Sequence, residues 1–244
     1  MKKIAVIGKV DRAALLKRYE ARSQKIEFNP CPADFAGVLE YSAVFFLNGS
    51  DDEIAPWVGN EHLRLSDCEE ALLAELDFYF GIPKPLEIER KYLVEMPDLK
   101  ALEAIPLCRG VEIQQAYARD EDNKNMRLRK RGADGCYAYI KTQKMRLTDT
   151  TRIELESRIT EQEYLDGIKG CPVLSKKRYL IVSGGKYFEL DVFPFWEEAV
   201  LEIELKNADE EFSFPPFLKI IREVTFDKAY RNSVIAQRYG IIQK

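Results

Sequence analysis

The sequence predicts an α+β fold in which a small α/β unit precedes an antiparallel sheet or barrel of eight strands. Three observations predict it: strand and helix signals alternate over residues 1–82, two prolines in "GIPKPLE" punctuate the chain, and strand after strand follows. The chain has 244 residues, enough for a medium domain with a smaller companion. We therefore expect one domain at residues 1–82 and a second at residues 83–244.

The N-terminal unit is predicted element by element. Residues 2–8 ("KKIAVIG") are a β-branched run, and residues 11–23 ("DRAALLKRYEARS") have helical spacing after an Asp at the N-cap. Further strands are expected in "KIEFNP" and "YSAVFFLNGS", and residues 67–81 predict a helix that ends at Gly81. This order favours a parallel sheet. GxxxxGK[ST] and GxGxxG are both missing, so a docking or regulatory role is favoured over nucleotide binding.

The second part changes to segments of strand-like alternation with short polar or glycine-containing turns, which is typical of an antiparallel sheet or barrel. Helices are expected at residues 161–170 and 227–240. The eight strands are expected at residues 86–94, 111–119, 125–132, 136–143, 151–159, 175–183, 186–193 and 200–206.

Composition excludes several classes of function. The net charge of −4 argues against general attraction to nucleic acid, so the basic run "RLRKRG" is a weak candidate for such a patch. The five cysteines form no CxxC pair and are expected to be reduced thiols of a cytoplasmic protein. No apolar run reaches the length of a membrane span. His62 is the single histidine, so histidine-based catalysis is not favoured.

The predicted strands carry acids and bases at every second position, which places them on one face of the sheet. Like charges recur within one strand, as in Glu87/Glu89, Arg127/Arg129 and Glu202/Glu204. A solvated sheet face explains any one of these strands, but a merely soluble face would more often mix the two signs. Paired acids suit a hard divalent cation, and paired bases suit a multiply charged anion. The pattern therefore favours an enclosed, wet channel in which bound ions offset the repulsion.

The segment "EIERKYL" has the ExExK signature of the CYTH domain, the triphosphate tunnel metalloenzyme superfamily. "MRLRKR", "YIKTQ", "TRIELESRI", "LSKKRYLI", "FELDVF", "LEIEL" and "REVTFDKAYRNSVIA" follow in order, so the resemblance runs from about residue 86 to residue 239. It implies an eight-stranded antiparallel tunnel with a charged interior and flanking helices. Ala229 stands where the family usually has a base, and Lys228 or Arg231 is the substitute that the sequence offers.

The resemblance also implies roles for individual residues and a cofactor, Mg²⁺ or Mn²⁺. The residues implied to hold metal are Glu87, Glu89, Glu154, Asp191, Glu202 and Glu204. Those implied to bind phosphate are Lys91, Arg127, Arg129, Lys141, Arg152, Lys176, Arg178 and Lys228. The catalytic set implied is Glu87, Glu89, Lys91, Glu202 and Glu204.

The function that the resemblance implies is metal-dependent hydrolysis of a triphosphate, with inorganic tripolyphosphate favoured and water as the attacking group. Three alternatives stay open: a class IV-type adenylate cyclase, a thiamine triphosphatase, and a non-catalytic sensor of polyphosphate or nucleotide. The expected partner is a small triphosphate rather than nucleic acid or membrane. A homodimer is one state that the sequence allows.

Overall fold

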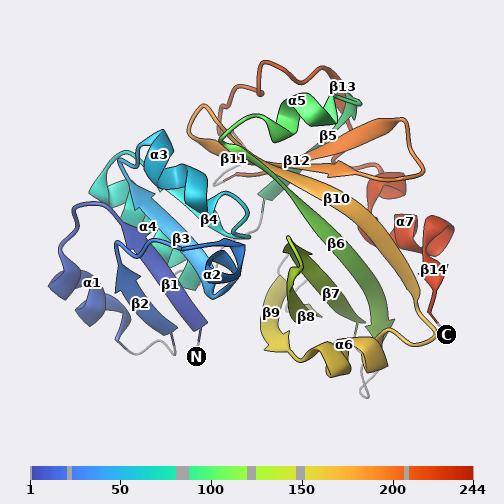
Figure 1. The fold of residues 1–244 in the computed structure, drawn as a ribbon, viewed down its shortest axis with the longest axis horizontal. Helices are drawn as coiled ribbons and strands as arrows, with labels where there is room; N and C mark the ends of the chain where they lie inside the picture. Colours follow the sequence, from blue (N-terminus) through green and yellow to red (C-terminus); the bar gives the residue numbers. More distant parts are fainter. Residues whose placement is uncertain are drawn as a thin grey trace.

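The fold contains a small parallel sheet and a large antiparallel sheet, which lie side by side (Figure 1). The computed structural model describes residues 2–20, 24–80, 88–119, 125–146, 152–205 and 209–243. In that part of the chain the small sheet has the order β2-β1-β3-β4, and the large one follows the path β13-β5-β12-β11-β10-β6-β7-β8-β9, with β14 on β10. The predicted α+β class is confirmed.

The N-terminal unit alternates strands and helices as predicted, and its strands pair in parallel. Asp11 caps the first helix by accepting a hydrogen bond from the backbone N–H of Ala14. The predicted end at Gly81 lies outside the described residues. The elements are β1 (Lys2–Ile7), α1 (Arg12–Tyr19), β2 (Gln24–Phe28), α2 (Phe35–Leu39), β3 (Tyr41–Leu47), α3 (Asp51–Ile54), the 3-10 helix η1 (Ala55–Trp57), β4 (Leu63–Ser66) and α4 (Glu69–Phe80).

The eight strands predicted for the second part correspond to β5 through β12. The helix predicted at residues 161–170 is present at 161–167, whereas the one predicted at 227–240 is divided at the extended Arg231 into a 3-10 helix and an α-helix. Two short strands, β13 and β14, add to the predicted set. The elements are β5 (Ile88–Glu95), α5 (Leu99–Glu103), β6 (Cys108–Arg119), β7 (Asn125–Ala133), β8 (Cys136–Arg146), β9 (Arg152–Ile159), α6 (Glu161–Gly167), β10 (Pro172–Ser183), β11 (Lys186–Val192), β12 (Glu198–Leu205), β13 (Ile220–Glu223), the 3-10 helix η2 (Lys228–Tyr230), α7 (Asn232–Tyr239) and β14 (Ile241–Ile242).

Closure of the large sheet into a tunnel is not seen. Among the described residues no backbone pairing joins β9 to β5 or β13, so the strands form an open path. The fold thus matches the expected antiparallel sheet, while the closed barrel stays a prediction. No helix in the described ranges is long and apolar enough to cross a bilayer.

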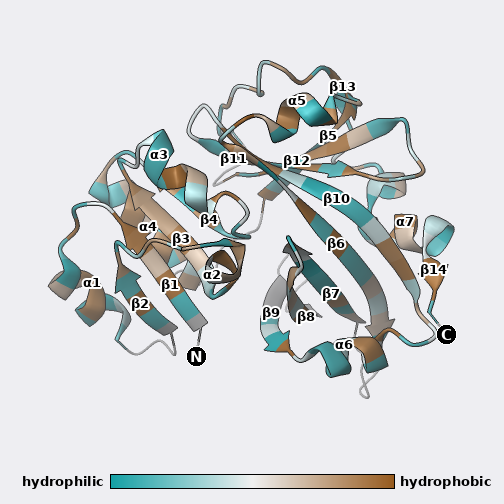
Figure 2. Cartoon of the chain, viewed as in Figure 1, coloured by the Kyte–Doolittle hydropathy of each residue, from teal (hydrophilic) through white to brown (hydrophobic). Residues whose placement is uncertain are grey.

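The small sheet buries both of its faces. Ile4 and Val6 of β1 point to one face, where they pack in a core with Leu15 of α1 and Leu72 of α4. The alternate β1 residues point the other way and pack in a second core with residues of β6 and β10. On β3, Ala43 and Phe45 belong to the first core, and Val44 and Phe46 belong to the second. Figure 2 shows apolar residues along β1 and β3. The large sheet therefore completes the core of the N-terminal unit.

One face of the large sheet changes from apolar to charged along its strands. On β6, Val111 and Ile113 pack against the N-terminal unit, whereas Tyr117 lies farther along on the same face. On β10, Leu180 is buried beside that unit, and Arg178 follows on the same face. Farther still, the face is covered by an apolar cluster that includes α7 residues. Charged side chains thus occupy the middle of the face, between two apolar cores.

Candidate functional site

The charged middle of this face holds a group of side chains that we call the central cluster. Its members come from strands paired in register, which brings Arg178 opposite Asp191, and Glu202 opposite both Glu189 and Lys91. The cluster consists of Glu89, Lys91, Lys176, Arg178, Glu189, Asp191 and Glu202. Alternation along the strands therefore gathers acids and bases from β5, β10, β11 and β12 as the sequence predicts.

Arg178 is the hub of the central cluster. Its Nε and Nη2 donate to the two carboxylate oxygens of Asp191, at 2.6 Å each, and Nη2 also donates to Glu202 Oε2 at 2.8 Å. Nη1 pairs with Glu189. Burial opposes its charge, but the neighbouring carboxylates outweigh burial and raise the pKa of Arg178 well above its usual value. The fork geometry of the guanidinium thus holds three acids from two strands.

Lys91 bridges Glu89 and Glu202, since its Nζ lies 3.1 Å from Glu89 Oε1 and also pairs with Glu202. Burial and the nearby charge of Glu202 raise the pKa of Glu89 to about 8. Burial would raise the pKa of Glu202 as well, but Lys91 and Arg178 hold it far below its ordinary range. Glu89 and Glu202 both pair with Lys91, but their pKa values are shifted in opposite directions.

Lys176 is the most deeply buried base of the central cluster. Its Nζ donates to Asp191 Oδ2 at 2.5 Å and to the side-chain oxygen of Asn232 at 3.3 Å. Burial, together with the charge of Arg178, lowers the pKa of Lys176 to about 8. Asn232 begins α7, so the C-terminal helix contributes one polar group to the site.

A second group, which we call the arginine cluster, is built on β7, β8 and β9. Arg127 and Arg129 each place Nη2 near Glu156 Oε1, at 3.2 and 3.3 Å, and Thr142 Oγ1 donates to the same oxygen at 2.9 Å. Burial favours the neutral acid, but His62 and the arginines hold the pKa of Glu156 far below its ordinary value. The arginine cluster is Arg127, Arg129, Thr142 and Glu156.

Tyr117 lies between the two clusters. Burial raises its pKa to about 12, and the charges that act on its hydroxyl come from both sides: Arg127 and Arg129, and Glu202 and Lys91. Gln115 Nε2 donates to this hydroxyl at 3.1 Å. The central and arginine clusters therefore lie on the same face of the sheet, on either side of β6.

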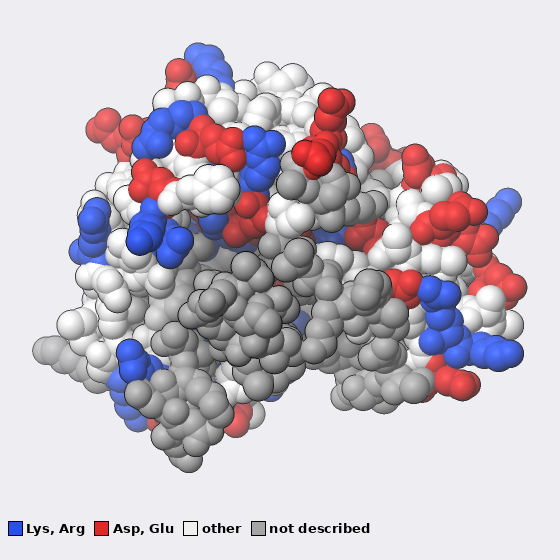
Figure 3. Space-filling view, turned by 180° about the vertical axis from the view of Figure 1, so that it is seen from behind, with Lys and Arg blue, Asp and Glu red and all other residues white. Residues whose placement is uncertain are grey.

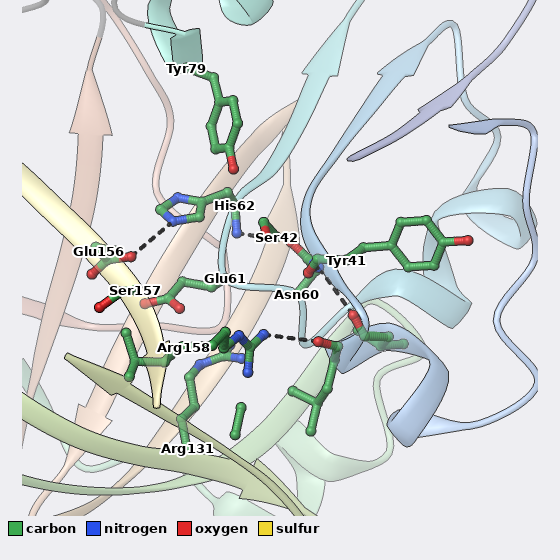
Figure 4. A pocket seen from close by; sticks show the side chains of 14 residues that line it. Tyr41, Ser42, Asn60, Glu61, His62, Tyr79, Arg131, Glu156, Ser157 and Arg158 are labelled. Carbon is green, nitrogen blue, oxygen red and sulfur yellow. Dashed lines mark hydrogen bonds and ion pairs between the residues drawn. The ribbon is translucent and has the colours of Figure 1, made fainter. Parts of the chain in front are cut away.

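The N-terminal unit also reaches this charged face, through the loop before β4 and through β4 itself. Glu61 pairs with Arg129, His62 Nε2 lies 3.8 Å from Glu156 Oε2, and Arg64 pairs with Glu204. Figure 4 shows Glu61 and His62 lining a pocket opposite Glu156 of β9. The predicted docking unit thus supplies charged groups of its own.

The resemblance implies a divalent cation, Mg²⁺ or Mn²⁺, and the side chains present show which residues could bind it. Glu89 and Glu202 offer hard oxygen ligands, and the raised pKa of Glu89 marks a place where added positive charge is favourable. Glu61, His62 and Glu156 form another candidate set, with one ligand atom of each within 4.8 Å of the others. Arg127 and Arg129 already neutralise the two acids of that set. Lys91 pairs with Glu89 and Glu202 in the same way, so both sets consist of hard oxygen ligands that a bound cation would take over from a base.

The structure brings most of the predicted residues together, but not all. Lys141 pairs with Leu128 across the sheet and so lies on the face opposite to Arg127 and Arg129. Lys228 is exposed on η2, and Glu204 turns to Arg64 rather than to the central cluster. Glu87 lies outside the described residues, as do the side chains of Arg152 and Glu154, so their predicted roles stay predictions.

Sequence reasoning missed several groups that the structure adds. Asn232 had a signal, because it stands in the segment "AYRN" that resembles the family. Glu156 lies on the predicted charged face, next to Arg152 and Glu154 in the alternation. The sequence gives no signal for Glu61, His62 and Arg64. They belong to no predicted strand of the second part and reach the site only through tertiary packing.

We expect Glu89 to make the metal-free protein less stable as pH rises from about 5 to 8. A carboxyl group whose pKa rises from 4.5 to about 8 on folding binds its proton more tightly in the folded state, so that stability is lost across this window. Because 39% of the side chain is exposed, screening limits the effect to about 1 kcal/mol. Urea unfolding at several pH values should show a flatter profile for Glu89→Gln, and equal slopes would contradict the assignment.

Comparison with known proteins locates the chain among hydrolases of triphosphates. No family model matches it. An inorganic triphosphatase from Acetivibrio thermocellus is 32% identical over 150 residues, which cover 60% of this chain and 90% of that protein. An inorganic triphosphatase from Nitrosomonas europaea is 30% identical over 156 residues, 62% of this chain and 96% of that protein.

A crystal structure of an inorganic triphosphatase shares 28% identity, covers 64% of this chain and 97% of its own, and superposes with a TM-score of 0.42. The two sequence relatives are matched over nearly their whole length, and the blocks from "EIERKYL" onward occur in order. The chain therefore belongs to the CYTH, or triphosphate tunnel metalloenzyme, superfamily.

Proposed function

We propose that this protein hydrolyses inorganic tripolyphosphate with the help of a divalent cation. The observation that carries the proposal is the single charged face of the large sheet, with the paired carboxylates Glu89 and Glu202 on one side of Tyr117 and Arg127 and Arg129 on the other. The relatives named inorganic triphosphatase support the substrate class. The reaction breaks one P–O–P bond and joins a water oxygen to phosphorus, releasing orthophosphate and pyrophosphate.

The bases of both clusters would bind phosphate oxygens. Arg129 is 5% exposed, and its Nε has no hydrogen-bond partner among the described residues, so a donor is available for an anion. Lys176 and Arg178 are now held by carboxylates, and substrate oxygens would share or replace those partners. Charge that develops on the leaving phosphate would be stabilised by donors already fixed in place.

Glu89 and Glu202 would hold Mg²⁺ or Mn²⁺, with Glu87 and Glu204 as further candidate ligands. Such an ion, when bound, neutralises phosphate charge and lowers the pKa of a bound water. Lys91 now bridges Glu89 and Glu202. With the ion bound between these acids, the Lys91 ammonium group would bind a phosphate oxygen of the substrate instead. Asp191 is bonded to Lys176 and Arg178, which favours an orienting role for it.

We also propose that the large sheet closes around the substrate as an eight-stranded tunnel, with Arg152 and Glu154 of β9 on the closing wall. Like charges crowded on one face are costly unless counter-charge and partial enclosure act together. Lys228 and the homodimer remain predictions beside this proposal. On the part of the surface coloured in Figure 3, basic and acidic side chains are interspersed, which suits a small substrate rather than a nucleic acid.

The test is a substrate panel. The purified full-length protein is offered tripolyphosphate, ATP, thiamine triphosphate and pyrophosphate with Mg²⁺ or Mn²⁺, and both released phosphate and cyclic AMP are measured. We expect metal-dependent phosphate release with tripolyphosphate as the preferred substrate. Cyclic AMP from ATP, or tight binding of all four compounds without turnover, would overturn the proposal.

A further inference from the structure

The N-terminal unit is fixed over one end of the charged face. Apolar residues of β6 and β10 pack with it in one core. Polar contacts add to this packing: Arg131 Nη2 donates to the carbonyl of Gly59 at 2.7 Å, and the Tyr187 hydroxyl donates to the carbonyl of Asn60 at 2.5 Å. Arg131 is buried under the unit. The loop that leads into β4 is thereby held against β7 and β11.

This loop ends the row of bases on β7. Arg127, Arg129 and Arg131 share one face of the strand, at spacings of about 7 Å. Arg131 donates a hydrogen bond to the Gly59 carbonyl, and Arg129 forms an ion pair with Glu61 of the loop. The Glu61 side chain is 18% exposed, and that of Arg129 is 6% exposed. Arg129 is therefore the last arginine of the row that is not bonded to the N-terminal backbone, and the Glu61 carboxylate lies directly beside it.

Glu61 carries a negative charge in this position. Burial would raise its pKa and Glu156 adds to that effect, but Arg129, Arg131 and His62 together outweigh both and keep the pKa below the ordinary value. An anion that occupies the arginine cluster can share the guanidinium with Glu61. A longer anion would have to place a further phosphate against this carboxylate, in a space with little water.

We propose that Glu61 is a specificity-determining residue, which limits the bound polyphosphate to a short chain by setting a fixed negative charge at the end of the basic row. This inference rests on the proposed function, because it takes a linear polyphosphate as the substrate class. It gives the N-terminal unit a role in substrate choice in addition to its role in packing.

The experiment compares tripolyphosphate with tetrapolyphosphate on the same preparations of full-length protein. For the wild-type protein we expect the shorter chain to have the higher kcat/KM. Glu61→Gln should lower this preference about tenfold, equivalent to 1.4 kcal/mol, through a lower KM for tetrapolyphosphate with kcat little changed. Glu61→Asp keeps the charge and should keep the preference. Glu70→Gln removes an exposed charge from α4 of the same unit and serves as the matched control.

A ratio is the chosen readout because a merely structural role of Glu61 would change both substrates equally. Three outcomes would overturn the inference and leave the proposed function standing. They are an unchanged ratio in Glu61→Gln, an equal loss of activity on both polyphosphates, and a wild-type preference for the longer polyphosphate. If the wild-type protein hydrolyses neither compound, the proposed function fails. The ratio of their Kd values by calorimetry in the same variants then decides on Glu61 alone.

Discussion

Glu202→Gln should abolish metal-dependent turnover of tripolyphosphate, with a loss in kcat of at least about 100-fold. The substitution keeps the size of the side chain but removes the charge that Lys91 and Arg178 face, and with it one proposed metal ligand. Glu202 is 5% exposed, so water cannot replace the lost oxygen charge at little cost. Phosphate release at saturating Mg²⁺ or Mn²⁺ measures the effect.

Glu198→Gln is the matched control, because Glu198 lies on the same strand and is exposed. It should retain full activity. Circular dichroism separates lost chemistry from lost fold in both variants. If folded Glu202→Gln hydrolysed tripolyphosphate at the wild-type rate, the assignment of Glu202 to metal or substrate would be refuted.

Arg178→Met should lower the free energy of unfolding by about 3–5 kcal/mol at neutral pH, because it leaves buried carboxylates without their common partner. Asp191 has almost no solvent contact, and Glu189 and Glu202 also pair with this guanidinium. Urea denaturation in the absence of divalent metal is the measurement. The loss should shrink toward low pH, where protonation removes the uncompensated charge.

Lys177→Met provides the comparison on the same strand. Lys177 is 44% exposed and pairs with Glu103 on the other face of the sheet, so its removal should cost less than about 1 kcal/mol. A similar small change for Arg178→Met would mean that the acids of the central cluster are compensated by other groups. Arg178 would then not be its hub.

The sequence was enough to predict the strands of the large sheet, because alternation with a period of two survives in each of them. The same parity placed Lys91, Arg178 and Glu202 on one face, and the register confirms that they meet. Lys141 shows the limit of the method. The alternation along its own strand did not show on which face of the sheet Lys141 lies. Because Lys141 pairs with Leu128, it lies on the face opposite to Arg127 and Arg129.

The contribution of the N-terminal unit could not be predicted, because its packing against β6 and β10 joins residues that are far apart in the sequence, such as Phe46 and Leu180. The polar run around Glu61 and His62 has no alternation and resembles an ordinary loop. Closure of the sheet is likewise a tertiary property. The strand pattern fixes which side chains share a face, but not how far the sheet curves.

The division of the small sheet into two buried faces has a consequence during synthesis on the ribosome. One face is covered by α1 and α4, so its core can form from the first 80 residues. The other face carries Val44 and Phe46, whose core is complete only when Leu180 and Val182 of β10 have emerged. At about 5–20 residues per second, a nascent apolar surface is exposed for several seconds or longer. We expect chaperones that bind such surfaces to engage this chain before its C-terminal half is complete.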